Sequence, residues 1–289
     1  MVAWQYSDLS NTIRKWISKF TVAALILFVS LYIYSGKIEP NWIQIVPIDL
    51  TIDNLDTAFE DFKVVQISDL HVSHSMPEKR LKRIFKLVNK QSPNVIAITG
   101  DIVTSYRHFN PQKLEKNLRQ LVSQDATLSV LGNHDRVGHK TAKLERSLAK
   151  SNINNLNNQV TIIHRGEAKL AFAGVDDPYW GTPDLDQVVA DLPADTPAIL
   201  LVHEPDYLGK SSKTHKFALQ LSGHSHGGQI RLPFMKPPIL PTGGRKYFIG
   251  LNKEEDTLGY TNRGLGMTGL SLRFNSRPEI TVFTLHSAG

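Results

Sequence analysis

The chain has 289 residues, of which 41% are hydrophobic and 21% charged, an ordinary composition for a globular protein. It contains no cysteine, which excludes disulfides and thiolate metal sites, so any metal must be held by His, Asp, Glu or Asn. The net charge of +6 fits a partner rich in phosphate, such as a lipid surface, a nucleotide or a nucleic acid, although lysine and arginine also simply solvate surfaces.

An uncharged apolar stretch at 20–36 lies between Lys19 and Lys37. It is near the lower limit for a membrane span, about 17 residues. Aromatic residues flank it, as is typical of membrane interfaces. We expect an N-terminal tail at 1–19 and an uncleaved transmembrane anchor at 20–36. A cleaved signal peptide is the alternative, but no small-residue cleavage site follows, and Arg14-Lys15 is only a degenerate twin-arginine signal.

The region after the anchor alternates between predicted strands and helices. Residues 37–61 form a connecting segment with a first strand at 41–52, broken at Pro47. We expect residues 62–289 to form one domain. Further strands are predicted at 63–68, 94–99, 127–131, 160–164, 169–174, 198–202, 217–221 and 279–285, and helices at 77–91, from 111 and at 140–150. This alternation indicates an α/β protein with parallel pairing of the strands around the first two helices.

Five of these strands end in side chains that can bind metals. These are Asp69 and His71, Asp101, Asn133 to Asp135, His203, and His224 with His226. Ligands bind beyond the carboxyl ends of strands in open α/β sheets, so these residues are expected to converge. Glycines at 100, 132 and 223 permit the tight turns that bring the following side chains over the strand ends.

The motifs D-x-H, G-D, G-N-H-D, a single H and G-H-x-H, in this order, resemble those of the calcineurin-like metallophosphoesterases, over about residues 62–286. The segments GHSHGGQIRLP, GRKYFIGL and LRFNSRPEIT resemble a narrower bacterial subgroup with an N-terminal membrane or export segment. That subgroup includes hydrolases of UDP-2,3-diacylglucosamine in lipid A synthesis. The resemblance implies a calcineurin-like phosphoesterase fold, in which two mixed β-sheets pack as a sandwich with flanking helices, here preceded by one transmembrane helix.

The resemblance also implies a dinuclear metal site. Asp69, His71 and His226 would bind one divalent metal ion, Asn133, His203 and His224 the other, and Asp101 would bridge them. Oxygen and imidazole ligands suit Mn²⁺, our first expectation, or alternatively Zn²⁺ or Fe. A metal-bound hydroxide would attack phosphorus directly, without a covalent enzyme intermediate.

Residues next to the expected ligands have candidate catalytic roles. His134 would protonate the leaving oxygen or stabilise its charge. Asp135 would either orient an imidazole or cap the following turn. The G-D motif continues as 102–105 without the aspartate and arginine found in many phosphoprotein phosphatases of the superfamily, which argues against that activity.

Weaker signals concern substrate binding. Arg136 could reach a phosphate or be a solvated arginine, and Gly228 and Gln229 could offer backbone N–H groups to phosphate. His74 could line the entrance or be exposed. Asp176 and Asp177 could support the site or form a turn. The apolar, proline-rich loop 232–241 could be a lip that meets acyl chains or the bilayer, or could pack on its own domain.

The expected substrate is a phosphorylated small molecule or a lipid-linked phosphodiester or pyrophosphate. A nuclease or other nucleotide phosphodiesterase is an alternative, but no basic and aromatic stripe supports a nucleic-acid partner. A catalytically idle, membrane-anchored binding module would be expected to lose ligands, and all seven are present. No protein partner is indicated.

The expected location is the bacterial inner (plasma) membrane, crossed once. More Lys and Arg precede the apolar stretch than follow it, which predicts a cytoplasmic N-terminus and a catalytic domain on the outer face. A UDP-lipid substrate would instead require the cytoplasmic face, because UDP-sugars are cytoplasmic.

Overall fold

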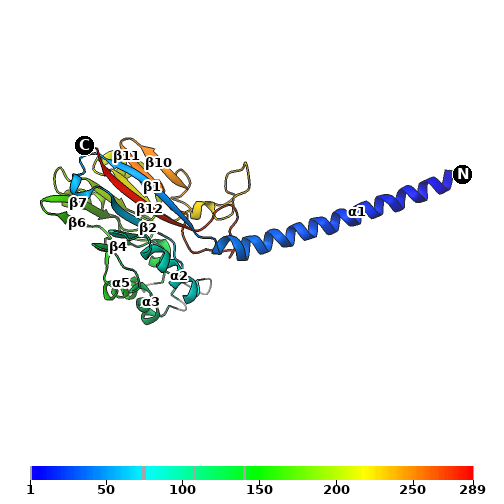
Figure 1. Ribbon diagram of the computed structural model, residues 1–289, viewed down its shortest axis with the longest axis horizontal. Helices are drawn as coiled ribbons and strands as arrows, with labels where there is room; N and C mark the ends of the chain where they lie inside the picture. The colour runs from blue at the N-terminus through cyan, green and yellow to red at the C-terminus, as the bar shows by residue number, and fades with distance from the viewer. Residues whose placement is uncertain (1, 73–75, 107–108, 139–140, 289) are drawn as a thin grey trace.

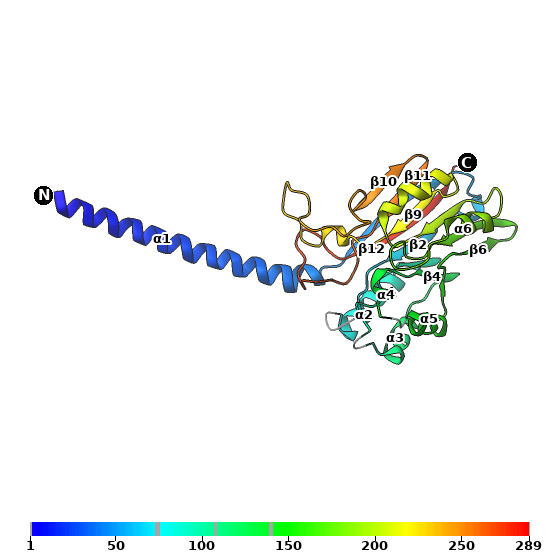
Figure 2. The same cartoon turned by 180° about the vertical axis from the view of Figure 1, so that it is seen from behind.

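Two six-stranded mixed sheets form the body of the protein, and a long helix projects from it (Figures 1 and 2). The computed structural model describes residues 2–72, 76–106, 109–138 and 141–288. The strands of the first sheet, in spatial order, are β1 (Gln44–Ile52), β12 (Glu279–Ser287), β2 (Phe62–Ile67), β3 (Val95–Thr99), β4 (Ala126–Val130) and β5 (Ile153–Asn155). The expected parallel pairing of β2, β3 and β4 is confirmed.

The second sheet contains the other two strands that carry expected ligands. Its order is β10 (Gly250–Glu254), β11 (Thr257–Thr261), β9 (Leu219–Ser222), β8 (Ala198–Leu201), β7 (Ala168–Gly174) and β6 (Gln159–Arg165). β7, β8, β9 and β11 pair in parallel, and the two edge strands pair antiparallel.

Apolar side chains fill three layers and hold the sheets face to face. The central layer contains residues of both sheets, such as Val64 and Phe172, and its members are almost fully buried. The outer face of the first sheet packs on α2 (Glu78–Asn89), α3 (Pro111–Leu118) and α5 (Thr141–Lys150). The outer face of the second sheet packs on α6 (Leu185–Asp191). The sandwich with flanking helices is therefore confirmed.

One expectation about the strands was wrong. Pro47 does not break the first strand: β1 is continuous, because it lies at the sheet edge and pairs only with β12, so a missing N–H is tolerated there. The strands β5, β10 and β11 were not predicted. β1 shares a sheet with β2 and β12.

The N-terminal helix α1 spans Val2–Ile33 and continues through a π-helical turn (Tyr34–Ile38) and a 3₁₀ turn (Glu39–Asn41). It covers both the expected tail and the expected anchor. The segment Asn11–Asn41 is long and apolar enough to cross a membrane. Figures 1 and 2 show it extending away from the body.

Candidate metal centre and active site

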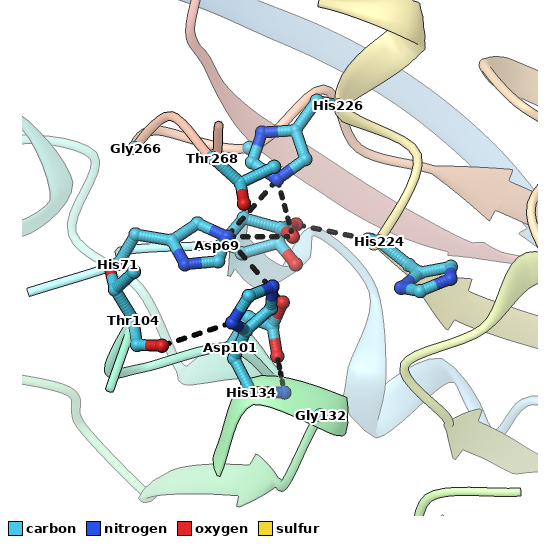
Figure 3. A network of polar contacts seen from close by, with 12 residues as sticks. Asp69, His71, Asp101, Thr104, Gly132, His134, His224, His226, Gly266 and Thr268 are labelled. Atoms are coloured by element: carbon cyan, nitrogen blue, oxygen red, sulfur yellow. Dashed lines mark hydrogen bonds and ion pairs between the residues drawn. The ribbon is translucent and has the colours of Figure 1, made fainter. Parts of the chain in front are cut away.

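Figure 3 shows that five of the expected ligands converge beyond the carboxyl ends of strands from both sheets: Asp69, His71, Asp101, His224 and His226. Their backbones share an unusual conformation. Positive φ angles between 45° and 69° occur at Asp69, His71, Asp101, His224 and His226. Each such angle costs a non-glycine residue about 1–2 kcal/mol, so it persists only where the surrounding structure enforces it, as functional sites do.

One cluster consists of Asp69, His71 and His226, whose potential ligand atoms all lie within 4.8 Å of one another. The Nε2 atoms of His71 and His226 are 3.1 Å apart, and His226 Nε2 is 3.3 Å from Asp69 Oδ1. The other carboxylate oxygen of Asp69 accepts a hydrogen bond from the backbone N–H of His224, at 3.1 Å. Asp69 thus links the two sheets with one oxygen and leaves the other facing the histidines.

A second cluster consists of Asp101, His203 and His224, again within 4.8 Å. Asp101 lies between the clusters, because its Oδ2 is 3.3 Å from His203 Nε2 and 3.5 Å from His71 Nε2. Its Oδ1 accepts a hydrogen bond from the backbone N–H of His134, at 2.9 Å. Both aspartates therefore use one oxygen for positioning and aim the other at nitrogen lone pairs.

Backbone carbonyls fix the rings of two histidines. His203 Nδ1 is 2.7 Å from the carbonyl oxygen of Thr99, and His224 Nε2 is 2.9 Å from that of Thr242. A carbonyl only accepts hydrogen bonds, so each of these nitrogens carries the proton. The opposite nitrogen of each ring is left with its lone pair for a ligand.

Burial keeps most of the site histidines uncharged. It lowers the pKa of His71 and of His224 to about 4 and that of His226 well below its ordinary value. Neutral imidazoles keep the lone pair that metal binding requires. The same burial raises the pKa of Asp69 to about 6.

Asp101 and His203 favour each other's charged forms, and a metal ion bound to His203 Nε2 would take the place of the proton that Asp101 favours there. Burial opposes a charge on either group, but their mutual attraction outweighs it: the pKa of Asp101 is lowered and that of His203 is raised well above its ordinary value. Asp101 therefore places a negative charge between the clusters.

Several buried ligand atoms lack a well-directed hydrogen bond within the described residues, namely Asp69 Oδ1, Asn133 Oδ1 and His203 Nε2. A buried polar atom without a partner costs about 1–3 kcal/mol. All three atoms belong to expected ligands, and cations would satisfy them. The donor set, oxygen and imidazole without thiolate, fits two divalent ions.

The glycines before the ligands have two different functions. Gly100 has a φ of +88°, which fits the expected turn. Gly132 and Gly223 have no such φ, and the reason for glycine there is space. A Cβ at Gly132 would lie 2.4 Å from Asp101 Oδ1, and one at Gly223 would lie 2.4 Å from Asp69 Oδ2.

His134 is oriented by the main chain. Its Nδ1 is 3.0 Å from the carbonyl oxygen of Thr104, and its ring meets that of His71 edge to face, with centroids 4.9 Å apart (Figure 3). Because the Thr104 carbonyl accepts the Nδ1 proton, Nε2 is the atom that can exchange protons with a substrate. The backbone carbonyl of Thr104 therefore orients His134.

Asp135 is fully buried, and the structure favours its capping role. Its carboxylate accepts backbone hydrogen bonds from Ile102 (3.1 Å), Val103 (2.9 Å) and Gly132 (3.1 Å). These bonds tie the loop after β3 to the turn that begins α4 (Asn133–Arg136).

Asn133 and His134 line a cavity of about 560 Å³ together with residues of both metal clusters. The cavity also has apolar walls from two loops, formed by Ile230, Pro238, Ile239, Pro241 and Leu270. Catalytic groups and an apolar surface therefore share one space.

The weaker substrate-binding candidates are distributed unevenly. Gly228 and Gln229 line the cavity, but their N–H groups already donate to the carbonyls of Ser225 and His226, so they are not available to phosphate as expected. Arg136 pairs with Asp176 and is not among the residues lining the cavity.

Asp177 and His74 are the remaining weaker candidates. Asp177 forms the expected turn, because its carboxylate accepts the N–H groups of Tyr179 and Trp180. His74 lies outside the described residues.

Sequence reasoning missed Arg273, which is fully buried against the site. Its guanidinium donates to several carbonyls, including those of Gly266 (2.7 Å) and Ser276 (2.8 Å), and approaches His226 Nδ1 to 3.4 Å. Burial lowers the pKa of Arg273 to about 9. No local pattern marks this role, since the partners are backbone atoms assembled by the fold.

Comparison with known proteins identifies the family. Residues 62–228 match the calcineurin-like phosphoesterase family. The chain is 37% identical to the uncharacterized metallophosphoesterase YkuE of Bacillus subtilis, over 89% of this chain and 90% of that one. The chain belongs to the calcineurin-like phosphoesterase family.

Two other relatives of this calcineurin-like phosphoesterase have names that describe an activity. Phosphodiesterase YaeI of Escherichia coli is 31% identical, over 91% of this chain and 96% of that one. UDP-2,3-diacylglucosamine pyrophosphatase LpxG of Chlamydia trachomatis is 25% identical, over 87% of this chain and 92% of that one.

As a calcineurin-like phosphoesterase, the protein is a hydrolase of phosphate esters, and its family binds two metal ions. Two cations bound at such a site polarise the phosphoryl oxygens and supply a nucleophile near neutral pH. The protein contributes the anionic carboxylate between the clusters and the fixed imidazoles. His134 contributes a proton site at Nε2.

Proposed function

We propose that the protein is a membrane-anchored, two-metal phosphodiesterase or pyrophosphatase that acts on a membrane lipid or lipid-linked substrate. The cavity is the main support for this proposal, because residues of both ligand clusters, His134 and apolar side chains line the same space. Such walls suit acyl chains better than a sugar or a nucleic acid. The apolar helix α1 supports the proposal, because it would hold the enzyme where such substrates are found.

The site residues divide into three roles in this proposal. Metal ligands are Asp69, His71 and His226 for one ion, Asn133, His203 and His224 for the other, and Asp101 for both. Mn²⁺ is the first candidate, with Zn²⁺ or Fe as alternatives. His134 donates a proton from Nε2 to the leaving oxygen, while Asp135 holds the loops that carry Asp101 and His134.

UDP-2,3-diacylglucosamine is the named candidate substrate, because LpxG is a relative. Hydrolysis of this substrate requires the catalytic domain to lie in the cytoplasm. The charges on either side of the proposed anchor, 20–36, instead favour a catalytic domain, 62–289, on the outer face of the membrane. A fluorescent protein fused to the C-terminus, one that fluoresces only in the cytoplasm, decides between them. Loss of fluorescence would exclude the UDP-lipid and leave an outer-leaflet lipid phosphodiester.

The proposed activity is tested with the full chain, which is loaded with Mn²⁺ and reconstituted in lipid nanodiscs. Rates are compared for bis-p-nitrophenyl phosphate, UDP-2,3-diacylglucosamine, UDP-N-acetylglucosamine and a short DNA duplex. We expect kcat/KM for the acylated substrate to exceed that for the acyl-free UDP-sugar by at least about 10²-fold, about 2.7 kcal/mol. Equal rates would refute the lipid proposal, and no hydrolysis of any substrate would favour an idle binding module.

A further inference from the structure

The end of the anchor helix is fixed to the body by buried contacts. Glu39 is fully buried, and its carboxylate accepts the backbone N–H groups of Asn275 (2.9 Å) and Ser276 (2.5 Å). The N–H of Arg273 donates to the carbonyl of Ser35, at 2.9 Å. These contacts set the direction in which α1 leaves the body, so a membrane that holds α1 also orients the catalytic domain.

The same segment, 273–276, contacts the active site. Ser276 Oγ donates to the carbonyl of His226, at 2.7 Å, and the guanidinium of Arg273 faces the ring of His226. The anchor therefore joins the body at the edge of the metal site, and the active-site cavity lies on the membrane-proximal side.

An array of exposed apolar side chains lies on this side. We call it the lip: Leu232, Phe234, Met235 and Ile239 in the loop 232–241, with Leu270 in the neighbouring loop. Phe234 is completely exposed and Ile239 is 79% exposed. In both Figures 1 and 2 the loop 232–241 projects from the body on the side from which α1 leaves. Ile239 and Leu270 also line the active-site cavity, so the lip borders its opening.

The charge around the lip matches an anionic lipid surface. Segment 229–252, which includes the loop of the lip, contains four Lys or Arg and no Asp or Glu. Lys236, within the lip loop, is exposed, as is Lys37 at the end of the anchor. Apolar side chains surrounded by basic ones are typical of surfaces that insert into the headgroup region of anionic bilayers.

We propose that the lip inserts into the surface of the same bilayer that holds α1, so that the active-site cavity opens onto the membrane. This rests on the anchor of the proposed function but not on the identity of the substrate. A protein partner would also cover an apolar surface, but only the bilayer is brought to the lip by the direction of α1. A lipid substrate then reaches the metal site sideways, with its acyl chains still in the membrane.

The absence of cysteine allows a direct test. Single substitutions Phe234→Cys and Met235→Cys are labelled with an environment-sensitive fluorophore in the full chain, reconstituted into phosphatidylglycerol and phosphatidylcholine vesicles that contain nitroxide-labelled acyl chains. The control is Val122→Cys, another exposed apolar position (62% exposed), beyond the end of α3. We expect at least threefold stronger quenching at 234 and 235 than at 122. Equal quenching would overturn the proposal.

Two further measurements separate the possible failures. Flotation with the vesicles tests the anchor: a chain that does not float refutes both the anchor and the inserted lip. Hydrolysis of soluble bis-p-nitrophenyl phosphate tests the site, and the labelled variants are expected to keep the wild-type rate. A chain that floats and hydrolyses this substrate but shows equal quenching refutes the lip alone.

Discussion

Asp101 accepts the backbone N–H of His134 on Oδ1, at 2.9 Å, and this bond turns Oδ2 toward His71 and His203. The turn that carries the proposed proton donor is thus built on the proposed bridging carboxylate. The two roles share one side chain, so their geometry is coupled, and a shift of either loop alters both.

Removing the negative charge of Asp101 should weaken metal binding. Asp101→Asn keeps an oxygen for the His134 N–H but places an amide where both clusters need an anion. We expect metal content, measured by plasma mass spectrometry, to fall from about two ions to at most one, with at least about 10²-fold lower kcat/KM. Asp256→Asn, at an exposed carboxylate, is the control. Two retained ions and full activity would contradict the bridging role.

His134→Ala separates proton donation from metal binding. We expect about 10²–10⁴-fold lower kcat with unchanged metal content, since a positioned acid is worth about that factor. The loss should be smaller for p-nitrophenolate, a good leaving group, than for an alkoxide, which needs the proton. An equal loss for both would argue against proton donation. His215→Ala, at an exposed histidine, should have no effect.

Asp135→Asn tests the capping role. The asparagine carbonyl oxygen can replace only one of the two carboxylate oxygens, and the NH2 group in the other position cannot accept a backbone N–H. We therefore expect a loss of about 1–3 kcal/mol in unfolding free energy, measured by denaturant titration. If Asp135 instead acted on an imidazole, the pH profile of kcat would shift while stability stayed at the wild-type value.

A surface pair gives the protein a pH-dependent contact at the C-terminal strand. His286 Nδ1 is 2.7 Å from Glu60 Oε1, and this bond raises the pKa of His286. The pKa of Glu60 is lowered, chiefly by the hydrogen bond from the backbone N–H of Ser287 and secondly by the hydrogen bond from His286. Asp49 and Asp61 also face the imidazole, at 3.7 and 3.8 Å.

The two pKa shifts define the pH range in which this contact stabilises the folded protein. The histidine contribution is complete below pH 6.5 and is lost as pH rises through the raised pKa, while the glutamate contribution is complete above pH 4.5 and is lost as pH falls. The difference in Tm between wild type and His286→Gln should therefore be largest between pH 4.5 and 6.5 and vanish in alkali. A difference that grows with pH would be contrary to this assignment.

Most of the site could be predicted because its ligands directly follow strands with strong apolar patterns. The apolar strands predicted at 63–68, 94–99 and 198–202 led to the expectation that Asp69, Asp101 and His203 converge, although β8 lies in a different sheet from β2 and β3. The strands β10 and β11 were missed because GLNKE and TLGYT lack a long apolar run and gain their strand form from pairing in the sheet.

The orienting groups could not be predicted for a different reason. The proton on His134 is fixed by the carbonyl of Thr104, and the anchor by N–H groups that reach Glu39 from residues more than 230 positions away. Backbone atoms are the same at every position, so only the fold reveals which of them are used.

Arg273 is the clearest example of a residue whose role only the fold reveals, and replacing it should destabilise the protein. A lysine has three donors on one atom and cannot reach the carbonyls of Gly264, Gly266 and Ser276 together. Arg273→Lys should therefore lower the unfolding free energy by at least about 2 kcal/mol, since two or more buried acceptors each lose about 1–3 kcal/mol. Arg165→Lys, at a partly exposed pair with Asp125, should cost at most about 1 kcal/mol. Equal losses in denaturant titration would mean that the buried carbonyl cage contributes no more than a surface pair.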